Sequence, residues 1–156
     1  MRINTDWPFE PNKLKFYYGW IIWVASALGI LCTIPGQTVG IAAFTDSLIT
    51  ALNISRTELS MAYLIGTIAS SFYLTWAGKW FDVLGARIMI STASLCFSLS
   101  IVYLSFVDNI GSLLGGSTLG NLSVITLGFF LIRFLGQGAL TNYSRNALLL
   151  WSNEKR

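Results

Sequence analysis

The sequence contains no histidine and few charged residues. The absence of histidine excludes histidine proton relays, serine–histidine triads and histidine metal sites. Charged residues make up 11% of the chain, whereas an ordinary soluble domain has about 25%. The net charge of +3 is too small to suggest binding to nucleic acid. The two cysteines, Cys32 and Cys96, each lie in an apolar run and are expected to be small packing residues.

What the chain has in place of charge is long apolar runs. A transmembrane helix needs about 20 predominantly apolar residues, and four runs are long enough, at about 18–44, 57–77, 88–107 and 122–140. Residues 1–16 form a polar tail without the apolar core of a signal peptide. The sequence therefore predicts an all-α, polytopic membrane protein, with a cytoplasmic tail at 1–16 and a membrane domain of four transmembrane helices at 17–156.

Local signals mark the boundaries and breaks of these runs. Pro35 lies inside the first run, where it removes a backbone hydrogen bond and predicts a kink. The sequence Ser55-Arg56-Thr57-Glu58 is a capping box that marks the start of the second helix. Residues 108–121 contain four glycines and predict a linker before the fourth helix.

The distribution of basic residues predicts the orientation in the membrane. With four spans, both termini and the turn between spans two and three lie on one side. That side holds eight basic residues: Arg2, Lys13, Lys15, Lys79, Arg87, Arg145, Lys155 and Arg156. The other side holds only Arg56. By the positive-inside rule the eight-base side is cytoplasmic, so we expect a multi-pass protein of the plasma or inner membrane with both termini in the cytoplasm.

Arg133 is the most informative single residue, because it lies near the middle of the fourth run. A central arginine costs at least roughly 2.5–3.5 kcal/mol on insertion scales, so it should face a cavity or a partner. Two interpretations stay open: an anion site, in which the guanidinium pairs with a carboxylate, or a structural arginine tied to polar groups such as Gln37. Gln37, Thr38 and Asn142 are further candidates for groups that line a cavity and bind a substrate.

The first and fourth runs share a short pattern, Gly36-Gln37 and Gly136-Gln137. Both pairs mark the point at which an apolar helix becomes polar. Transporters are often built from inverted three-helix repeats, in which the first and fourth helices are equivalent. The two pairs lie where such a repeat would place them.

The polar stretch Gly78-Lys79-Trp80-Phe81-Asp82-Val83-Leu84-Gly85-Ala86-Arg87 separates the second and third runs. A simple membrane turn needs glycine and a basic residue but no acid at a fixed spacing. Asp82 could pair with Arg87 and could also cap a helix N-terminus, where the helix dipole favours negative charge. Because both interactions can form and break as helices rock, Gly78, Asp82, Gly85 and Arg87 form a candidate gating motif.

These four residues resemble the turn between spans two and three of the major facilitator superfamily, whose pattern is Gly-x-x-x-Asp-Arg/Lys-x-Gly-Arg-Arg/Lys. Arg133-Phe134-Leu135-Gly136-Gln137-Gly138 looks like the arginine and glycine pattern of that family's fourth span. The stretches Tyr18-Gly19-Trp20-Ile21-Ile22 and Ser55-Arg56-Thr57-Glu58 look like its monocarboxylate and oxalate/formate branch.

The resemblance implies twelve helices in two six-helix halves, with alternating access to a site between them. The chain would then correspond to the first part of the N-terminal bundle, and we expect it to be an N-terminal fragment. The implied function is transport of a small organic anion by a secondary carrier, driven by an ion gradient such as protons or by exchange, without a cofactor. The alternative is a complete four-span accessory or scaffolding subunit. Because no nucleophile–base pair or metal cluster is visible, an enzyme is not expected.

Overall fold

The computed structural model describes residues 19–113 and 117–154, and all of its regular elements are helices. The predicted tail at 1–16, residues 114–116 of the predicted linker, and Lys155 and Arg156 lie outside this range. The seven α-helices are α1 (Gly19–Cys32), α2 (Thr38–Leu52), α3 (Arg56–Leu84), α4 (Ala86–Ser105), α5 (Val107–Leu113), α6 (Thr118–Ile132) and α7 (Thr141–Glu154). A 3₁₀ turn, η2 (Ile34–Gly36), separates α1 from α2, and a π-helix, η3 (Arg133–Leu140), joins α6 to α7.

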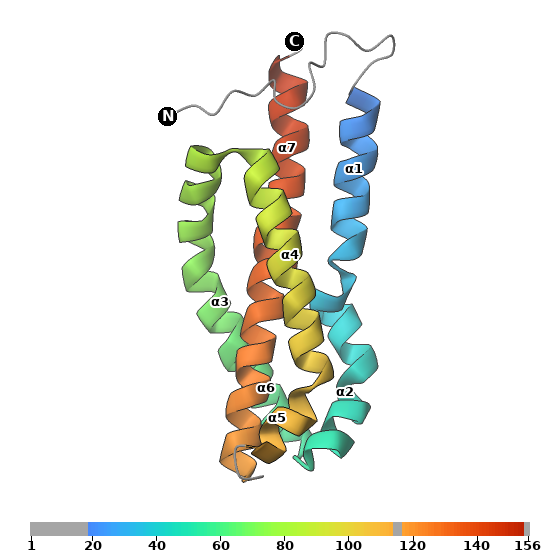
Figure 1. Cartoon of the computed structure of the whole chain (residues 1–156), viewed down its shortest axis with the longest axis vertical. Coiled ribbons are helices and arrows are strands. Elements are labelled where there is room, and N and C mark those ends of the chain that lie inside the picture. The colour runs from blue at the N-terminus through green and yellow to red at the C-terminus, as the bar shows by residue number, and fades with distance from the viewer. Residues whose placement is uncertain (1–18, 114–116, 155–156) are drawn as a thin grey trace.

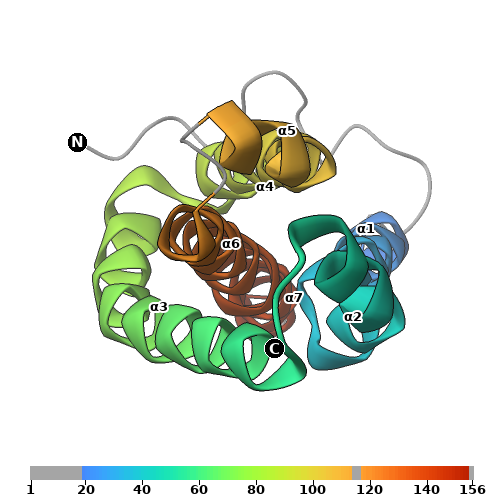
Figure 2. The ribbon, with the colours of Figure 1, turned by 90° about the horizontal axis from the view of Figure 1, so that it is seen from below.

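The helices form an elongated bundle around the continuous α6–η3–α7 helix (Figure 1). This central helix contacts α3, α4 and α1, which lie on three sides of it (Figure 2). In Figure 1, α1 and α2 run down the bundle, α3 returns to the top, α4 descends, and the central helix returns to the top. The start of α1, the α3–α4 turn and the end of α7 therefore lie at one end of the bundle, which we call the turn end.

Length and composition qualify two of the described helices as candidate membrane spans, namely Ala86–Ser105 and Thr118–Leu149. A third candidate arises if α2 and α3, which meet at an angle of 119°, are counted as one bent span. Helix α1 is apolar but has only 14 residues. The structure thus shows an all-helical chain with two or three candidate spans, where the sequence predicted four.

The bundle exposes large apolar side chains along its length. Val39 and Phe72 are each more than three-quarters exposed, and Leu95 is 64% exposed. Soluble monomers rarely expose contiguous apolar surface on this scale. Among the tryptophans whose side chains the structure describes, four are exposed near the turn end, and such rings favour a membrane interface: Trp20, Trp23, Trp76 and Trp80. The exposed surface is therefore compatible with a membrane location.

The first predicted helix is broken rather than kinked. Helix α1 ends at Cys32, and Pro35 lies in the 3₁₀ turn that follows. Helix α2 then continues to Leu52, eight residues beyond the predicted end at 44. Asn53 ends α2 in the left-handed conformation, with φ of 50°. The predicted capping box is confirmed, because the Ser55 hydroxyl accepts a hydrogen bond from the Glu58 amide and the Glu58 carboxylate accepts one from the Ser55 amide.

The predicted glycine-rich linker at 108–121 is wrong in its extent. Helix α5 occupies 107–113, and α6 already begins at Thr118. The glycine at position 111 allows close packing instead of mobility, since a Cβ there would lie 2.4 Å from Oδ1 of Asn121. The Asn121 amide in turn donates to the carbonyl of Leu52 at 3.0 Å, which ties the start of α6 to the end of α2.

Candidate functional site

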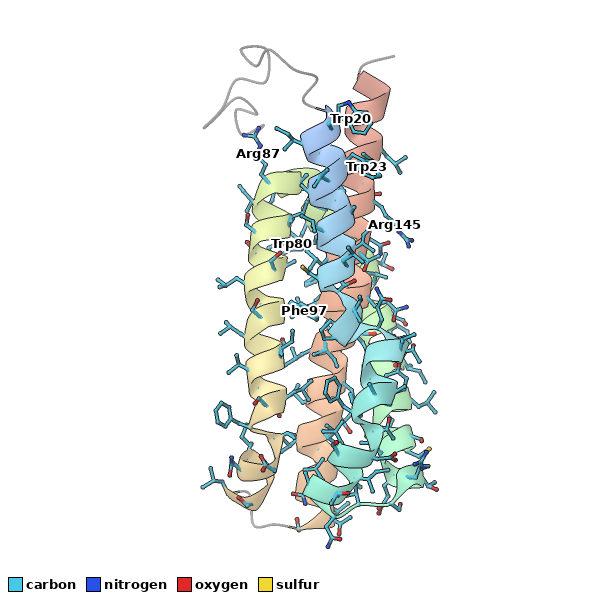
Figure 3. The ribbon with its side chains drawn as sticks, turned by 90° about the vertical axis from the view of Figure 1, so that its right-hand side faces the viewer. Trp20, Trp23, Trp80, Arg87, Phe97 and Arg145 are labelled. Carbon is cyan, nitrogen blue, oxygen red and sulfur yellow. The ribbon has the colours of Figure 1, made fainter. Side chains whose placement is uncertain are left out.

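The 3₁₀ turn between α1 and α2 meets the π-helix of the central helix at the centre of the bundle. A Cβ on Gly36, in the 3₁₀ turn, would lie 3.2 Å from the Cα of Gly136 in the π-helix and 2.6 Å from the carbonyl oxygen of Ile132. The ring of Phe97 closes this crossing from α4, as Figure 3 shows. Close approach of the two backbones therefore requires glycine on both sides. The repeated Gly-Gln pairs of the sequence thus meet in space.

Polar side chains beside this crossing satisfy backbone groups around the 3₁₀ turn and the π-helix. Gln37 donates from Nε2 to the Thr33 hydroxyl at 3.0 Å, and the Thr33 hydroxyl donates to the carbonyl of Ile30. Thr141 lies within 3.3 Å of the same hydroxyl and donates to the carbonyl of Gly136 at 3.0 Å. Thr33 and Thr141 are buried, so these hydrogen bonds stabilise the contact between the 3₁₀ turn and the π-helix.

Arg133 begins the π-helix and is held by groups from three elements. Its Nη1 donates to Oε1 of Gln137, one turn further along, and to the hydroxyl of Thr38 in α2 at 3.3 Å. The guanidinium carbon lies 5.1 Å from the centre of the Tyr63 ring of α3, within range of a cation–π interaction. The hydroxyls of Tyr63 and Thr38 are 3.1 Å apart. The cluster of Arg133, Gln137, Thr38 and Tyr63 is the candidate site.

All of the partners of Arg133 in this cluster are neutral. No carboxylate in the described part of the chain forms an ion pair with Arg133, although Arg56 and Asp46 pair at 2.5 Å on an exposed surface. Nη2 and Nε of Arg133 have no hydrogen-bond partner among residues 19–113 and 117–154. The side chain is half-buried, while Thr38 and Gln137 are exposed. The cluster therefore presents one edge of a guanidinium whose charge is not neutralised by a described residue.

The structure brings only two of the four predicted substrate-binding residues together. Arg133 and Thr38 are in contact, whereas the side chain of Gln37 turns to Thr33 instead of Arg133. Asn142 lies nine residues beyond Arg133, is half-buried, and makes no side-chain hydrogen bond to a described residue.

Sequence reasoning missed two members of the cluster. Gln137 is four residues after Arg133, a spacing that places two side chains on one face of a helix, so its contact could have been inferred. Tyr63 lies on a different helix, and no local signal in the sequence connects it with Arg133.

The candidate gating motif is not a ten-residue turn. Helix α3 continues through Gly78 and Asp82 to Leu84, and Gly85 alone joins it to α4. Gly85 has φ of 82° and ψ of 160°, a conformation that favours glycine. A Cβ on Gly78 would meet no atom within 4 Å. The turn therefore requires glycine at Gly85 but not at Gly78.

The two interactions expected of Asp82 are not formed between the described residues. Asp82 and Arg87 make no ion pair with each other. In Figure 3 the Arg87 side chain lies at the turn end and points outward from the bundle. No side chain caps the N-terminus of α4. Because α3 is still helical at Asp82, its exposed carboxylate lies on α3 and not within the turn.

A separate cavity of about 210 Å³ lies between α3, α4 and the central helix. Five aromatic residues contribute to its lining: Tyr73, Trp76, Trp80, Phe134 and Tyr143. None of the described residues that line it is charged. Its chemistry suits apolar groups, so it is not part of the candidate site around Arg133.

The fold and site define a helical bundle with candidate membrane spans and a half-buried arginine where the interrupted α1–α2 segment crosses the π-helix of the central helix. Comparison with protein-family models, curated proteins and solved structures finds no match to this chain.

Proposed function

We propose that this chain binds a small organic anion at Arg133 as part of a secondary carrier that works by alternating access. The observation that carries the proposal is a guanidinium in the middle of the 32-residue candidate span Thr118–Leu149 without a carboxylate partner among the described residues. Ionisable groups at such a depth are costly and usually mark a substrate or ion pathway. A bound anion would supply the missing counter-charge.

The geometry of Arg133 suits a carboxylate. Gln137 and Thr38 occupy Nη1, and the Tyr63 ring covers one face of the guanidinium. The remaining edge, formed by Nη2 and Nε, can donate two parallel hydrogen bonds to a carboxylate. These contacts fix the orientation of the guanidinium before a ligand arrives, which lowers the entropic cost of binding.

The backbone around the site supports a carrier. Transporters commonly place their substrate sites near the bilayer midplane, where discontinuous helices meet. Here the 3₁₀ turn at Ile34–Gly36 and the π-helix at Arg133–Leu140 meet beside the cluster. Pieces of π-helix occur often at functional sites.

We further propose that the chain crosses the membrane four times, as in the major facilitator superfamily. The 29 residues of α3 extend about 43 Å at 1.5 Å per residue, which exceeds a hydrocarbon core of about 30 Å. Helices α1 and α2 together provide another crossing. The turn end carries Lys79 and Arg87 together with the start of α1 and the end of α7, and we propose that it faces the cytoplasm.

Equilibrium dialysis of the purified full chain in detergent against ¹⁴C-lactate and ¹⁴C-oxalate tests the anion site. Substitution Arg133→Gln removes hydrogen bonds to a charged group worth about 1.5–3 kcal/mol, so binding should weaken roughly ten- to hundredfold. Arg133→Lys should weaken it less, because the charge remains while the paired donors are lost. Arg56→Gln is the matched control and should leave binding unchanged.

Equal binding by the parent chain and Arg133→Gln would show that Arg133 is not the anion site. Uptake of the same anions into proteoliposomes, under a proton gradient or with internal anion for exchange, then tests transport. Binding without uptake would limit the proposal to anion binding by this chain.

A further inference from the structure

Beyond Arg133 the central helix continues into α7, toward the turn end. On α7, Ser144 faces α1, since a Cβ on Gly29 would lie 2.7 Å from its Oγ. Tyr143 faces α3, where its hydroxyl donates to the carbonyl of Ala77 at 3.0 Å. The side of α7 turned away from these contacts carries polar residues that are exposed or half-buried: Asn142, Arg145 and Asn146.

Arg145 is the charged residue on this side of α7. It is exposed and extends away from the bundle on the side opposite α4 (Figure 3). It makes no hydrogen bond or ion pair with any residue in the ranges 19–113 and 117–154. Arg145 follows Arg133 by twelve residues, which corresponds to at most about 18 Å along a helix.

Between residues 118 and 149, the charge along this helix has a single sign. The segment 118–149 contains Arg133 and Arg145 but no aspartate or glutamate. Two cations without opposing charge, on a surface flanked by apolar helices, produce a positive potential that attracts anions. At low salt this potential extends far enough to link the two residues, because the Debye length is about 30 Å at 0.01 M.

We propose that Arg145 forms an outer anion site, which captures small carboxylates at the turn end and delivers them to Arg133. The inference rests on the proposed anion site at Arg133 and adds a second contact to it. Arg145 acts through the charge of its side chain and not through a fixed hydrogen-bond geometry, since no described neighbour holds its guanidinium in place. It therefore sets the rate of arrival more than the strength of the final complex.

Stopped-flow fluorescence with dansylglycine as the anionic probe, and dansylamide as the neutral one, measures this rate on the full chain in detergent. Arg145→Gln should lower the association rate constant for dansylglycine about three- to tenfold at low salt. The difference should shrink below about twofold near 0.3 M salt, where the Debye length falls below 10 Å. Arg145→Lys keeps the charge and should restore the rate. Dansylamide should show no dependence on residue 145.

Lys79→Gln is the matched control. The contact of Tyr143 with Ala77 places Lys79 and Arg145 at similar levels, each two residues further toward the turn end. Lys79 is exposed, but it lies sixteen residues after Tyr63 and therefore about 160° around α3 from the candidate site. Removing this charge changes the net charge equally. Because Lys79 faces away from the candidate site, Lys79→Gln should lower the association rate clearly less than Arg145→Gln does.

An equal effect of Lys79→Gln and Arg145→Gln would overturn the inference, because it would show a general effect of net charge. An unchanged rate in Arg145→Gln would overturn it as well. If Arg133→Gln still weakened equilibrium binding in that case, the anion site at Arg133 would stand without the outer one. If Arg133→Gln had no effect, the proposed function itself would fail.

Discussion

Replacing Gly36 by alanine should separate the helices that cross at the centre of the bundle. The added Cβ would lie 2.6 Å from the carbonyl oxygen of Ile132, 3.1 Å from the Phe97 ring and 3.2 Å from the Cα of Gly136. Two of these three atoms belong to the backbone, so no side-chain rotation can remove the overlap. Overpacking of a well-packed interior costs about 1–3 kcal/mol. We expect Gly36→Ala to cost about 2 kcal/mol, or about thirtyfold in the unfolding equilibrium constant.

The free energy of unfolding can be measured by titration with sodium dodecyl sulfate in mixed micelles, followed by tryptophan fluorescence. Gly78→Ala is the matched control, because it adds the same methyl group to a helix interior where no atom lies within 4 Å. Alanine is preferred over glycine in a helix by roughly 0.5–1 kcal/mol, so this variant should be stabilised. A Gly36→Ala protein as stable as the parent would refute the close crossing.

The same crossing predicts an asymmetry between its two glycines. A Cβ on Gly136 would meet the ring of Phe97 at 2.6 Å and 3.0 Å, so here the nearest atoms belong to a side chain. A second substitution, Phe97→Leu, should therefore recover part of the stability lost in Gly136→Ala. It should recover little in Gly36→Ala, where the Ile132 carbonyl remains. Equal recovery in both backgrounds would contradict the geometry of the crossing.

Three further substitutions test the ends of α3 and its contact with α7. Gly85→Ala places a side chain at φ of 82° and should destabilise the protein by about 1–3 kcal/mol in the same titration, so an unchanged midpoint would contradict this turn. Ser55→Ala removes the capping box and should cost about 1 kcal/mol, with Thr at the same position retaining most of the stability. Tyr143→Phe leaves the Ala77 carbonyl without its side-chain donor and should cost about 0.5–1.5 kcal/mol, while Tyr143→Leu should cost more because the stacking on Phe81 is also lost.

The features that the sequence predicted correctly are those set by local chemistry. The Ser55–Glu58 box marks a helix start because both groups act within one turn, and α3 indeed begins at Arg56. Pro35 interrupts the first helix because it lacks an amide hydrogen wherever it lies in the fold. The apolar runs also predicted helices. Their number and length predicted four membrane spans, whereas two described helices qualify as spans on their own.

The features that it did not predict depend on contacts between distant segments. The polar residues between Gly78 and Arg87 indicated a long turn, yet a helix tolerates polar side chains at its exposed end, and only Gly85 needs a backbone conformation that ends it. The π-helix at Arg133–Leu140 has no recognised local signal. It occurs where Gly136 packs against Gly36 and where the Thr141 hydroxyl donates a hydrogen bond to the Gly136 carbonyl. Neither contact can be inferred from the local sequence.

The two interpretations of Arg133 that the sequence left open are compatible with each other in this geometry. Thr38, Gln137 and Tyr63 hold the guanidinium, which is what a structural role requires. These partners are neutral, however, so they satisfy donors without balancing the charge. A purely structural arginine would lose stability when replaced by glutamine, which is shorter and cannot make the same contacts, and the binding of anions would not change. An anion-binding arginine would lose its ligand in the same substitution while the fold stayed intact. Arg133→Gln therefore separates the roles when binding and the free energy of unfolding are measured on the same preparation.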